Sequence, residues 1–539
     1  MKIYLAQDTP IVGGLEYNYQ SICQHYNKSL ELGCDVCVLP ELFLCGYTPS
    51  DLLLKHSFIN KITRYIDKLS NITTQTVLLL PTPYLINGKV YNAVLGLQNG
   101  SVIGISLKKN LPNYGVFDEK RYFSSGDPSI ISINGVKVGV VICEDLWTPE
   151  IVSNLKHDGA EVIISINASP FEIGKLSRRL DVVQSRWKES QLPILYCNQA
   201  LGLDGVVYDG STFAYDGEVK GAMKPFEDSS IIIDFHEKQF SKSTIHSYTE
   251  IDMVYGAIVF GLREYFERTG FKSCVIGLSG GIDSALVAAI ASDALGPENV
   301  LVVMMPSKFT SKSSVDDAAE FLKRNPKILS KTISIEEILD ASVKSISDLS
   351  QIAYENLQAR IRGNILMSIS NTEDRLLLTT GNKSEIATGY STLYGDMCGA
   401  FNPIKDVYKT NVIDLSNWRN KNLPQSIKIS NDSLNVIPEK IILKEPTAEL
   451  RENQKDTDAL PRYEILDKIL HMYIEENLDE EDIINAGFEC DVVKKVIKLV
   501  NLSEYKRWQA APGVKITNQS FIKDRRYPIS ISYDKNSSI

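Results

Sequence analysis

Short apolar runs alternate with stretches of helical periodicity along the first 235 residues. The apolar runs predict strands at residues 35–39, 76–80, 136–142, 160–166 and 193–197. Tight hairpin turns are expected at dipeptides that favour them, namely Asn87-Gly88, Asn99-Gly100, Asn134-Gly135 and Asp216-Gly217. Strands with helices between them indicate a layered α/β domain.

The pattern changes in the second part of the chain. Residues 236–249 are polar, rich in Ser and Lys, and lack periodicity, which predicts a connector. An amphipathic helix is expected from Met253, because apolar residues then recur at helical spacing. The following alternation predicts strands at 274–278, 300–305, 328–334 and 375–380, with helices at 314–324 and 357–370. This alternation is typical of a doubly wound parallel sheet.

These patterns divide the chain into two domains. We expect one domain at residues 1–240, a connector at 241–252 and a second domain at 253–539, whose part beyond residue 415 is mostly helical. A chain of 539 residues is too long for one ordinary core, which agrees with this division.

Composition narrows the class of protein. The chain is 43% hydrophobic and 23% charged, as in soluble globular proteins. A net charge of −10 argues against a nucleic-acid partner, and no apolar run approaches the roughly 20 residues of a membrane helix. The N-terminus becomes polar too early for a signal peptide. Nine scattered cysteines favour reduced thiols and a cytoplasmic protein, and Cys34-x-x-Cys37 is interpreted as a pair of ordinary buried thiols.

The run Ser279-Gly280-Gly281-Ile282-Asp283-Ser284 connects a predicted strand to a predicted helix. Adjacent glycines let backbone N–H groups turn toward an anion, and a helix N-terminus adds free donors. The run therefore predicts a phosphate cradle. It lacks the Gly-Lys-Ser/Thr ending of a Walker A loop, and it resembles the pyrophosphate loop of the N-type ATP pyrophosphatases, which cleave ATP between its α and β phosphates.

Three separated apolar runs in the first domain each lead to a reactive side chain: Glu41, Lys108 and Cys143. Strand ends are where α/β folds present catalytic groups. A cysteine is a good nucleophile as the thiolate, a carboxylate can take its proton, and a lysine can stabilise an oxyanion. Taken singly, each residue has an ordinary structural role in packing, solvation or helix capping. Their combination favours a nucleophilic site.

The order of these three residues resembles the Glu-Lys-Cys site of the nitrilase superfamily. Residues 111–123 and 167–171 further resemble the glutaminase domain of the glutamine-dependent NAD synthetases. This resemblance implies a nitrilase-like α-β-β-α sandwich and points to Lys108, rather than Lys109, as catalytic. It also implies that glutamine is bound by Tyr114, Glu144, Ser169 and Lys175. One departure is Asp204-Gly205, where the family usually has Asp-Glu.

Several strings of the second domain resemble the synthetase domain of the same family, in the same order. They are residues 355–363, 378–385, 389–396, 445–451, 456–463, 504–507 and 525–529. The resemblance implies a Rossmann-like, doubly wound N-type ATP pyrophosphatase domain. It assigns ATP binding to Gly277, Leu278, Ser279, Gly280, Gly281, Ile282, Asp283, Ser284 and Thr380. It assigns Mg²⁺ to Asp283 and Glu385, and deamido-NAD to Asn356, Glu385 and Lys506.

The resemblance covers nearly the whole chain and implies one overall reaction. Ammonia released from glutamine would amidate deamido-NAD to NAD through an adenylated intermediate, with release of AMP and pyrophosphate. The implied small-molecule partners are glutamine, ATP and deamido-NAD, with Mg²⁺ as cofactor. A tunnel for ammonia and a homo-oligomer are also implied, whereas nucleic-acid and membrane partners are not.

Two alternatives remain open from the sequence. Another glutamine-dependent N-type ATP pyrophosphatase would amidate a different carboxylate, although the nitrilase-type half and the string 381–385 argue against the asparagine, GMP and argininosuccinate synthetases. A nucleotide-binding regulatory protein with inactive sites is expected to have lost Glu41, Lys108, Cys143 or Asp283, and all four are present.

Overall fold

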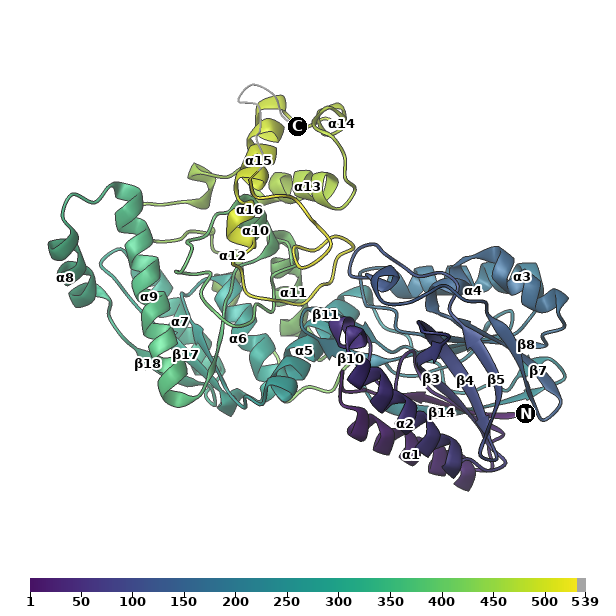
Figure 1. Ribbon diagram of the computed structural model, residues 1–539. Coiled ribbons are helices and arrows are strands. Elements are labelled where there is room, and N and C mark those ends of the chain that lie inside the picture. Colours follow the sequence, from purple (N-terminus) through teal and green to yellow (C-terminus); the bar gives the residue numbers. More distant parts are fainter. Residues whose placement is uncertain (531–539) are drawn as a thin grey trace. The chain divides into compact units, whose positions relative to one another are not determined.

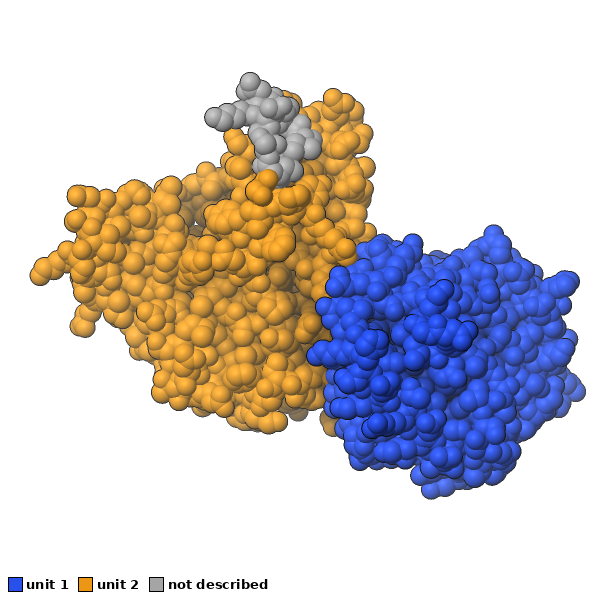
Figure 2. Space-filling view, viewed as in Figure 1, with its two compact units in different colours: residues 1–201, 207–248 blue, residues 202–206, 249–539 orange. Residues whose placement is uncertain are grey.

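The computed structural model describes residues 1–530 (Figure 1). The chain forms two compact units (Figure 2). Unit 1 contains Met1–Leu201 and Val207–Tyr248, and unit 2 contains Gly202–Val206 and the chain from Thr249 onward. Among the described residues, no helix is long and apolar enough to cross a membrane.

Unit 1 is built on two mixed sheets. The first has the strand order β15-β14-β1-β2-β3-β4-β5 and the second the order β13-β12-β9-β8-β7-β6. The strands of the first sheet are β1 (Lys2–Gln7), β2 (Val36–Val38), β3 (Val77–Ile86), β4 (Lys89–Gln98), β5 (Ser101–Leu107), β14 (Ser229–His236) and β15 (Gln239–Phe240). Those of the second are β6 (Ser129–Ile133), β7 (Val136–Ile142), β8 (Val162–Asn167), β9 (Ile194–Asn198), β12 (Phe213–Tyr215) and β13 (Val219–Ala222).

Helices cover the outer faces of these sheets. Helices α1 (Leu15–Glu31) and α2 (His56–Ile72) pack against the first sheet, and α3 (Pro149–His157) and α4 (Lys175–Ser190) pack against the second (Figure 1). The inner faces meet in one aliphatic core that includes Val38 and Leu79 from the first sheet and Val140, Ile164 and Leu195 from the second. Unit 1 is therefore the α-β-β-α sandwich that the sequence predicted.

The Asn-Gly dipeptides form the expected hairpin turns. Asn87, Asn99 and Asn134 have φ of 48°, 49° and 49°, and the glycine after each also has positive φ. Two successive residues with positive φ make a type I′ turn, whose twist matches that of the flanking strands. These turns fix the registers of β3–β4, β4–β5 and β6–β7.

Unit 2 contains a four-stranded parallel sheet with the order β18-β17-β16-β19. Its strands are β16 (Cys274–Gly277), β17 (Val300–Met304), β18 (Leu329–Thr332) and β19 (Leu376–Leu378). Helix α6 (Ile282–Leu295) packs against β16 and β17, and α9 (Gln351–Glu373) packs against β16 and β19. Helix α6 consists mostly of small and aliphatic residues, and nearly all of its residues are buried. This arrangement is the predicted doubly wound parallel sheet.

The remaining helices complete unit 2. They are α5 (Glu250–Thr269), α7 (Lys312–Arg324), α8 (Glu336–Ile346), α10 (Lys383–Thr388), α11 (Lys409–Lys421), α12 (Glu439–Leu443), α13 (Tyr463–Ile474), α14 (Glu480–Asn485), α15 (Cys490–Leu502) and α16 (Glu504–Arg507). The last of these form a separate helical group, in which α13, α14 and α15 share an aliphatic core that also includes Ala387 of α10. Helix α10 is thus packed against the helices α13 and α15.

Some element boundaries differ from the sequence prediction. Helix α5 begins at Glu250 rather than Met253, because the side chain of Thr249 caps it by accepting a hydrogen bond from the Asp252 amide. Helix α9 begins at Gln351, six residues before its predicted start at Leu357, and Ser350 caps it in the same way. The first turns of both helices contain polar residues. A prediction based on the spacing of apolar residues therefore places the helix starts too late.

The two-sheet core of unit 1 predicts a stability difference between buried and exposed isoleucines. Ile164→Ala, fully buried on β8, should lower the free energy of unfolding by about 2–5 kcal/mol through lost burial and a residual cavity. Ile103→Ala on β5, where the side chain is 41% exposed, should cost about 1 kcal/mol or less. Urea denaturation measures both, and equal losses would contradict this assignment of the core.

Candidate active sites

The reactive residues predicted in unit 1 follow strand ends. Lys108 comes directly after β5, and Cys143 comes directly after β7 and opens the short 3-10 helix η3 (Cys143–Trp147). Glu41 lies in the loop after β2. All three side chains are buried.

A buried ion-pair cluster joins two of these residues. The Lys108 Nζ atom lies 2.7 Å from Glu41 Oε1 and also 2.7 Å from Glu119 Oε1. Burial by itself lowers the pKa of Lys108, but Glu119 and Glu41 raise it well above its usual value. Lys108 is therefore a fixed cation.

Charges of this cluster act on the thiol of Cys143. Burial and the negative charge of Glu41 raise its pKa well above its usual value, and Lys108 offsets part of the rise. The thiol is consequently protonated in the free protein, so that a base must remove its proton before it attacks a substrate.

The sequence reading did not single out Glu119. Burial raises its pKa to about 7, and Tyr47 donates a hydrogen bond of 2.7 Å to its Oε1 atom. Asn92 similarly donates a 2.7 Å bond to Glu41. Glu119 lies within the string 111–123 that carried the family resemblance. Nothing in that string indicated that its carboxylate is buried beside Lys108.

The backbone near Cys143 is held in an unusual conformation. Its φ is 48°, a region that residues other than glycine rarely adopt. Asp145 accepts hydrogen bonds from the backbone N–H groups of Lys109 and Asn110 and from that of Ile142. One carboxylate thereby joins the loop that carries Lys108 to the turn that carries Cys143.

The predicted glutamine-binding residues have polar partners in unit 1. The hydroxyl of Tyr114 donates a 2.9 Å hydrogen bond to Glu144 Oε2, and Tyr114 is exposed. Ser169 is held by Arg179, which bonds to its side chain and its carbonyl. Lys175 lies 3.2 Å from Glu172. Tyr114 and Glu144 thus form one pair, whereas Ser169 and Lys175 each have partners of their own on or near α4.

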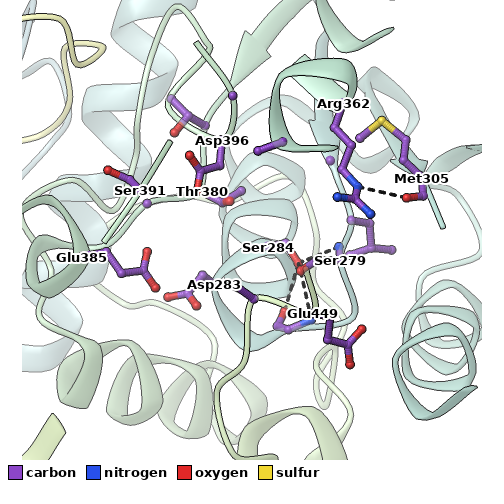
Figure 3. A pocket seen from close by; sticks show the side chains of 18 of the residues that line it. Ser279, Asp283, Ser284, Met305, Arg362, Thr380, Glu385, Ser391, Asp396 and Glu449 are labelled. Carbon is purple, nitrogen blue, oxygen red and sulfur yellow. Dashed lines mark hydrogen bonds between the residues drawn. The ribbon is translucent and has the colours of Figure 1, made fainter. Parts of the chain in front are cut away.

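Unit 2 contains a cavity of about 430 Å³ at the carboxyl ends of its strands. Its wall includes the phosphate-cradle residues Gly277, Leu278, Ser279, Gly281, Ile282, Asp283 and Ser284, together with Thr380 and Glu385 (Figure 3). The hydroxyl of Ser284 accepts a hydrogen bond from the Ser279 amide, which fixes the curve of the loop. The predicted ATP residues thus share one cavity wall, with the exception of Gly280.

Gly280 has a structural role in this loop. Its φ is +81°, and a Cβ atom at this position would lie 2.3 Å from the carbonyl oxygen of Ser314. Both the backbone conformation and the close approach require glycine. The sequence reading assigned it to ATP binding; the structure places it behind the wall, where it allows the loop to pack against α7.

The charges at one end of the cavity surround Asp283. Lys409 forms an ion pair with its Oδ2 atom, and Asn382 donates a 2.9 Å hydrogen bond to its Oδ1 atom. Lys409 Nζ also lies 3.8 Å from Glu385 Oε1. Figure 3 shows Asp283 and Glu385 side by side. The two carboxylates that the sequence predicted as metal ligands therefore lie together, with a lysine it did not predict.

Burial controls the ionisation of this cluster. Desolvation and the charge of Asp283 raise the pKa of Glu385 well above its usual value, while Lys409 lowers it in part. Burial likewise raises the pKa of Asp456, which also lines the cavity and whose Oδ1 atom has no hydrogen-bond partner among residues 1–530. The cluster is short of positive charge, a property suited to a cation.

The remaining predicted residues lie just outside the cavity wall. Asn356 accepts a 2.9 Å hydrogen bond from the Thr392 hydroxyl, and Lys506 donates bonds to the carbonyls of Gly389 and Ser391. Both residues thus hold the segment 389–396, parts of which line the cavity. The structure does not bring Asn356 and Lys506 into the same wall as Glu385.

A further cation on the wall was not predicted. Arg362 of α9 donates a 3.1 Å hydrogen bond from Nε to the carbonyl of Met305 at the end of β17. Burial lowers its pKa to about 10, so its guanidinium stays charged at neutral pH. Arg362 lies within the string 355–363 that carried the resemblance, but nothing in that string indicated that its side chain lines the cavity.

Comparison with known proteins matches both halves of the chain. The carbon-nitrogen hydrolase family model matches residues 5–236, and the NAD synthase model matches residues 254–510. The glutamine-dependent NAD(+) synthetase of Acinetobacter baylyi is 40% identical over 98% of this chain and 98% of its own length. That of Thermotoga maritima is 39% identical over the same shares. The chain belongs to the glutamine-dependent NAD(+) synthetases.

Solved structures agree with the family. The glutamine-dependent NAD+ synthetase from Acinetobacter baumannii, in complex with ADP, is 38% identical with a TM-score of 0.78 and 98% coverage of each chain. The enzyme from Cytophaga hutchinsonii has a TM-score of 0.83 at 21% identity, covering 98% of this chain and 97% of its own, and shows the same fold. The chain is thus a ligase that amidates deamido-NAD to NAD at the expense of ATP, with nitrogen from glutamine.

The position where this chain departs from the family pattern is closely packed. A Cβ atom on Gly205 would lie 2.3 Å from the carbonyl oxygen of Gly513, and the Gly205 carbonyl accepts a 2.7 Å hydrogen bond from Lys515. No larger residue fits this conformation. The glutamate that the family resemblance implied for this position would therefore not fit here.

The packing of Gly280 predicts a selective loss of ATP binding. Gly280→Ala should weaken ATP binding by about tenfold or more, because the loop must move away from Ser314. Gly270→Ala is the matched control, since its φ is +84° but no atom lies within 4 Å of its Cβ position. Calorimetric titration with ATP tests the pair. Wild-type affinity in Gly280→Ala would contradict the role given to this loop.

Proposed function

We propose that unit 1 hydrolyses glutamine through a thioester on Cys143. Glu41 acts as the base that takes the thiol proton and later activates the hydrolytic water. Lys108, together with a backbone N–H beside Cys143, stabilises the oxyanion of the tetrahedral intermediates. The observation that carries this proposal is the buried Lys108 ammonium, which lies 2.7 Å from Glu41 and whose charge acts on the Cys143 thiol.

The pKa shifts of Cys143 and Lys108 support these roles. The raised pKa of Cys143 keeps its proton on sulfur until a base removes it, and Glu41 is the adjacent carboxylate whose charge the thiol senses most. The raised pKa of Lys108 keeps it cationic through the cycle. Glu119 holds the lysine from its other side, so that Lys108 remains in place when Glu41 becomes protonated.

The glutamine substrate is assigned to Tyr114, Glu144, Ser169 and Lys175. A carboxylate such as Glu144 can pair with the α-ammonium of glutamine, and a lysine such as Lys175 can pair with its α-carboxylate. Burial lowers the pKa of Lys175, although Glu172 partly opposes this. Tyr114 is exposed and donates a hydrogen bond to Glu144.

In unit 2, the loop 277–284 and Thr380 are assigned to ATP. Free N–H groups at the start of α6 can donate hydrogen bonds to the phosphates. Ligands of parallel sheets usually bind at the carboxyl ends of the strands, where this loop lies. Asp283 and Glu385 offer the hard oxygen ligands that Mg²⁺ prefers. No three metal-ligating residues of the described chain gather into a complete metal site. Two carboxylates therefore fit a magnesium ion that takes its other ligands from phosphate and water.

Adenylation of the nicotinate carboxylate makes AMP the leaving group for attack by ammonia. The bound Mg²⁺ would offset phosphate charge during this step. Lys409 keeps Asp283 oriented, and deamido-NAD is assigned to Asn356, Glu385 and Lys506. The segment 389–396, which Asn356 and Lys506 hold, carries the wall residues Ser391 and Asp396 toward the cavity.

Three broader expectations accompany this function. The family-model matches at residues 5–236 and 254–510 support domains at 1–240 and 253–539 with a connector at 241–252. The nine cysteines are free thiols, which suits a reducing, cytoplasmic setting. A homo-oligomer remains a prediction, for which sedimentation would give the number of subunits.

Cys143→Ala should abolish NAD formation from glutamine and leave NAD formation from ammonium salts intact. Cys197→Ala is the matched control, because Cys197 is also buried at the end of a strand, but its thiol bonds to the Ala6 carbonyl. Product analysis with each nitrogen source makes the comparison. Loss of both activities in a folded Cys143→Ala protein would contradict the division of labour.

Glu385→Gln should have the opposite pattern. It removes one of two carboxylates next to the loop 277–284, so NAD formation should fall by about a hundredfold with either nitrogen source. Glutamine hydrolysis, measured as glutamate release, should persist. If NAD formation is unchanged, Glu385 does not act in the synthetase site.

A further inference from the structure

The helix α10, Lys383–Thr388, has six residues and carries Glu385 in the cavity wall. A helix this short is not stable by itself. The position of Glu385 therefore depends on contacts that hold the first turn of α10. Asn382 caps this turn, and its side chain accepts a hydrogen bond from the Glu385 amide.

Consecutive side chains of the first turn point to different partners. Lys383 forms buried ion pairs with Asp406 and Glu475. Ser384 donates a 2.5 Å hydrogen bond to Asp467 Oδ1. The next residue, Glu385, faces the cavity. The turn is thus held on two sides while its third side chain is directed at the substrate site.

Asp467 belongs to α13 and also holds a second helix. Its Oδ2 atom accepts hydrogen bonds of 2.9 Å from both the amide and the hydroxyl of Thr410, in the first turn of α11. The two first turns are also joined directly, because the Lys409 amide donates a 3.0 Å bond to the Ser384 hydroxyl. One carboxylate thereby fixes the starts of α10 and α11 against each other.

The residues next to these contacts are the charged groups of the cavity. Glu385 follows Ser384, and Lys409 precedes Thr410. Lys409 lies 3.8 Å from Glu385 and pairs with Asp283. Asp467 is 6% exposed and is not part of the cavity wall, so its influence on the site passes through the two helices. Its charge also lies at helix N-termini, where a carboxylate is favourable.

We propose that Asp467 is a positioning residue for the ATP site: by bonding to Ser384 and Thr410 it sets the spacing of Glu385 and Lys409 around Asp283. The proposal deepens the function proposed above and rests on the roles given there to Asp283 and Glu385. On this proposal, helix α13 contributes to ATP binding without contacting the nucleotide.

Asp467→Asn tests the proposal in the full chain. The amide keeps one oxygen acceptor but replaces the other with a donor, so one of the two helix starts loses its partner. Affinity for ATP in the presence of Mg²⁺, measured by calorimetry, should fall about tenfold to a hundredfold. Titration with ATP in EDTA should show a smaller loss, because the displaced groups are those assigned to the metal. Glutamine hydrolysis should be unchanged.

Asp252→Asn is the matched control. Asp252 is 5% exposed and accepts hydrogen bonds from the Ser426 hydroxyl and from the amides of Gln425 and Ser426, in the same unit and with similar chemistry. None of these residues lines the cavity. Its loss should lower stability without changing ATP affinity. Equal losses of ATP affinity in both variants, or no loss in Asp467→Asn, would overturn the proposal.

Two milder variants apply if Asp467→Asn does not fold. Ser384→Ala removes the hydrogen bond between α10 and Asp467. Thr410→Val removes the hydroxyl hydrogen bond between α11 and Asp467 with little change in side-chain shape. Each should lower the Mg²⁺-dependent ATP affinity, and unchanged affinity in both would overturn the proposal. Failure here is distinct from failure of the proposed function. If Glu385→Gln abolishes NAD synthesis while these variants bind ATP normally, only the role of Asp467 is wrong.

Discussion

Each site in this protein depends on a lysine ammonium buried between two carboxylates. Lys108 lies between Glu41 and Glu119 in unit 1, and Lys409 lies between Asp283 and Glu385 in unit 2. Transferring such charges from water into a protein interior is costly, and removal of one partner leaves an uncompensated charge. The surrounding structure must therefore hold all members of each cluster, which explains why so many backbone and side-chain bonds converge on them.

The fold meets this requirement by bringing strand ends and helix starts together. In unit 1, Asp145 joins the loop after β5 to the turn after β7. In unit 2, Asp467 joins the first turns of α10 and α11. Both are buried carboxylates that are not among the residues proposed to react with or bind the substrates. The same physical device, a carboxylate that accepts bonds from two separate segments, supports both sites.

Local patterns in the sequence were enough to predict much of this arrangement. Apolar runs indicated the strands that precede Lys108 and Cys143, and the Gly280-Gly281 turn indicated the loop before α6. Charged partners far apart in sequence were harder to predict. Lys409 is 126 positions from Asp283, and no periodicity links the two. Glu119 and Asp467 were missed for the same reason, since a charge that is buried by tertiary packing has no local signature.

The tip of the β10–β11 hairpin, Gly202–Val206, belongs to unit 2, although the chain on both sides of it belongs to unit 1. The strands of this hairpin are β10 (Ala200–Leu203) and β11 (Val206–Asp209). No single cut of the polypeptide can therefore separate the two units cleanly. A fragment that ends near residue 240 would keep the hairpin but leave the Gly205 carbonyl without the Lys515 amide that satisfies it. In this chain, evolutionary gain or loss of one half would have to remodel the tip of this hairpin as well as the connector.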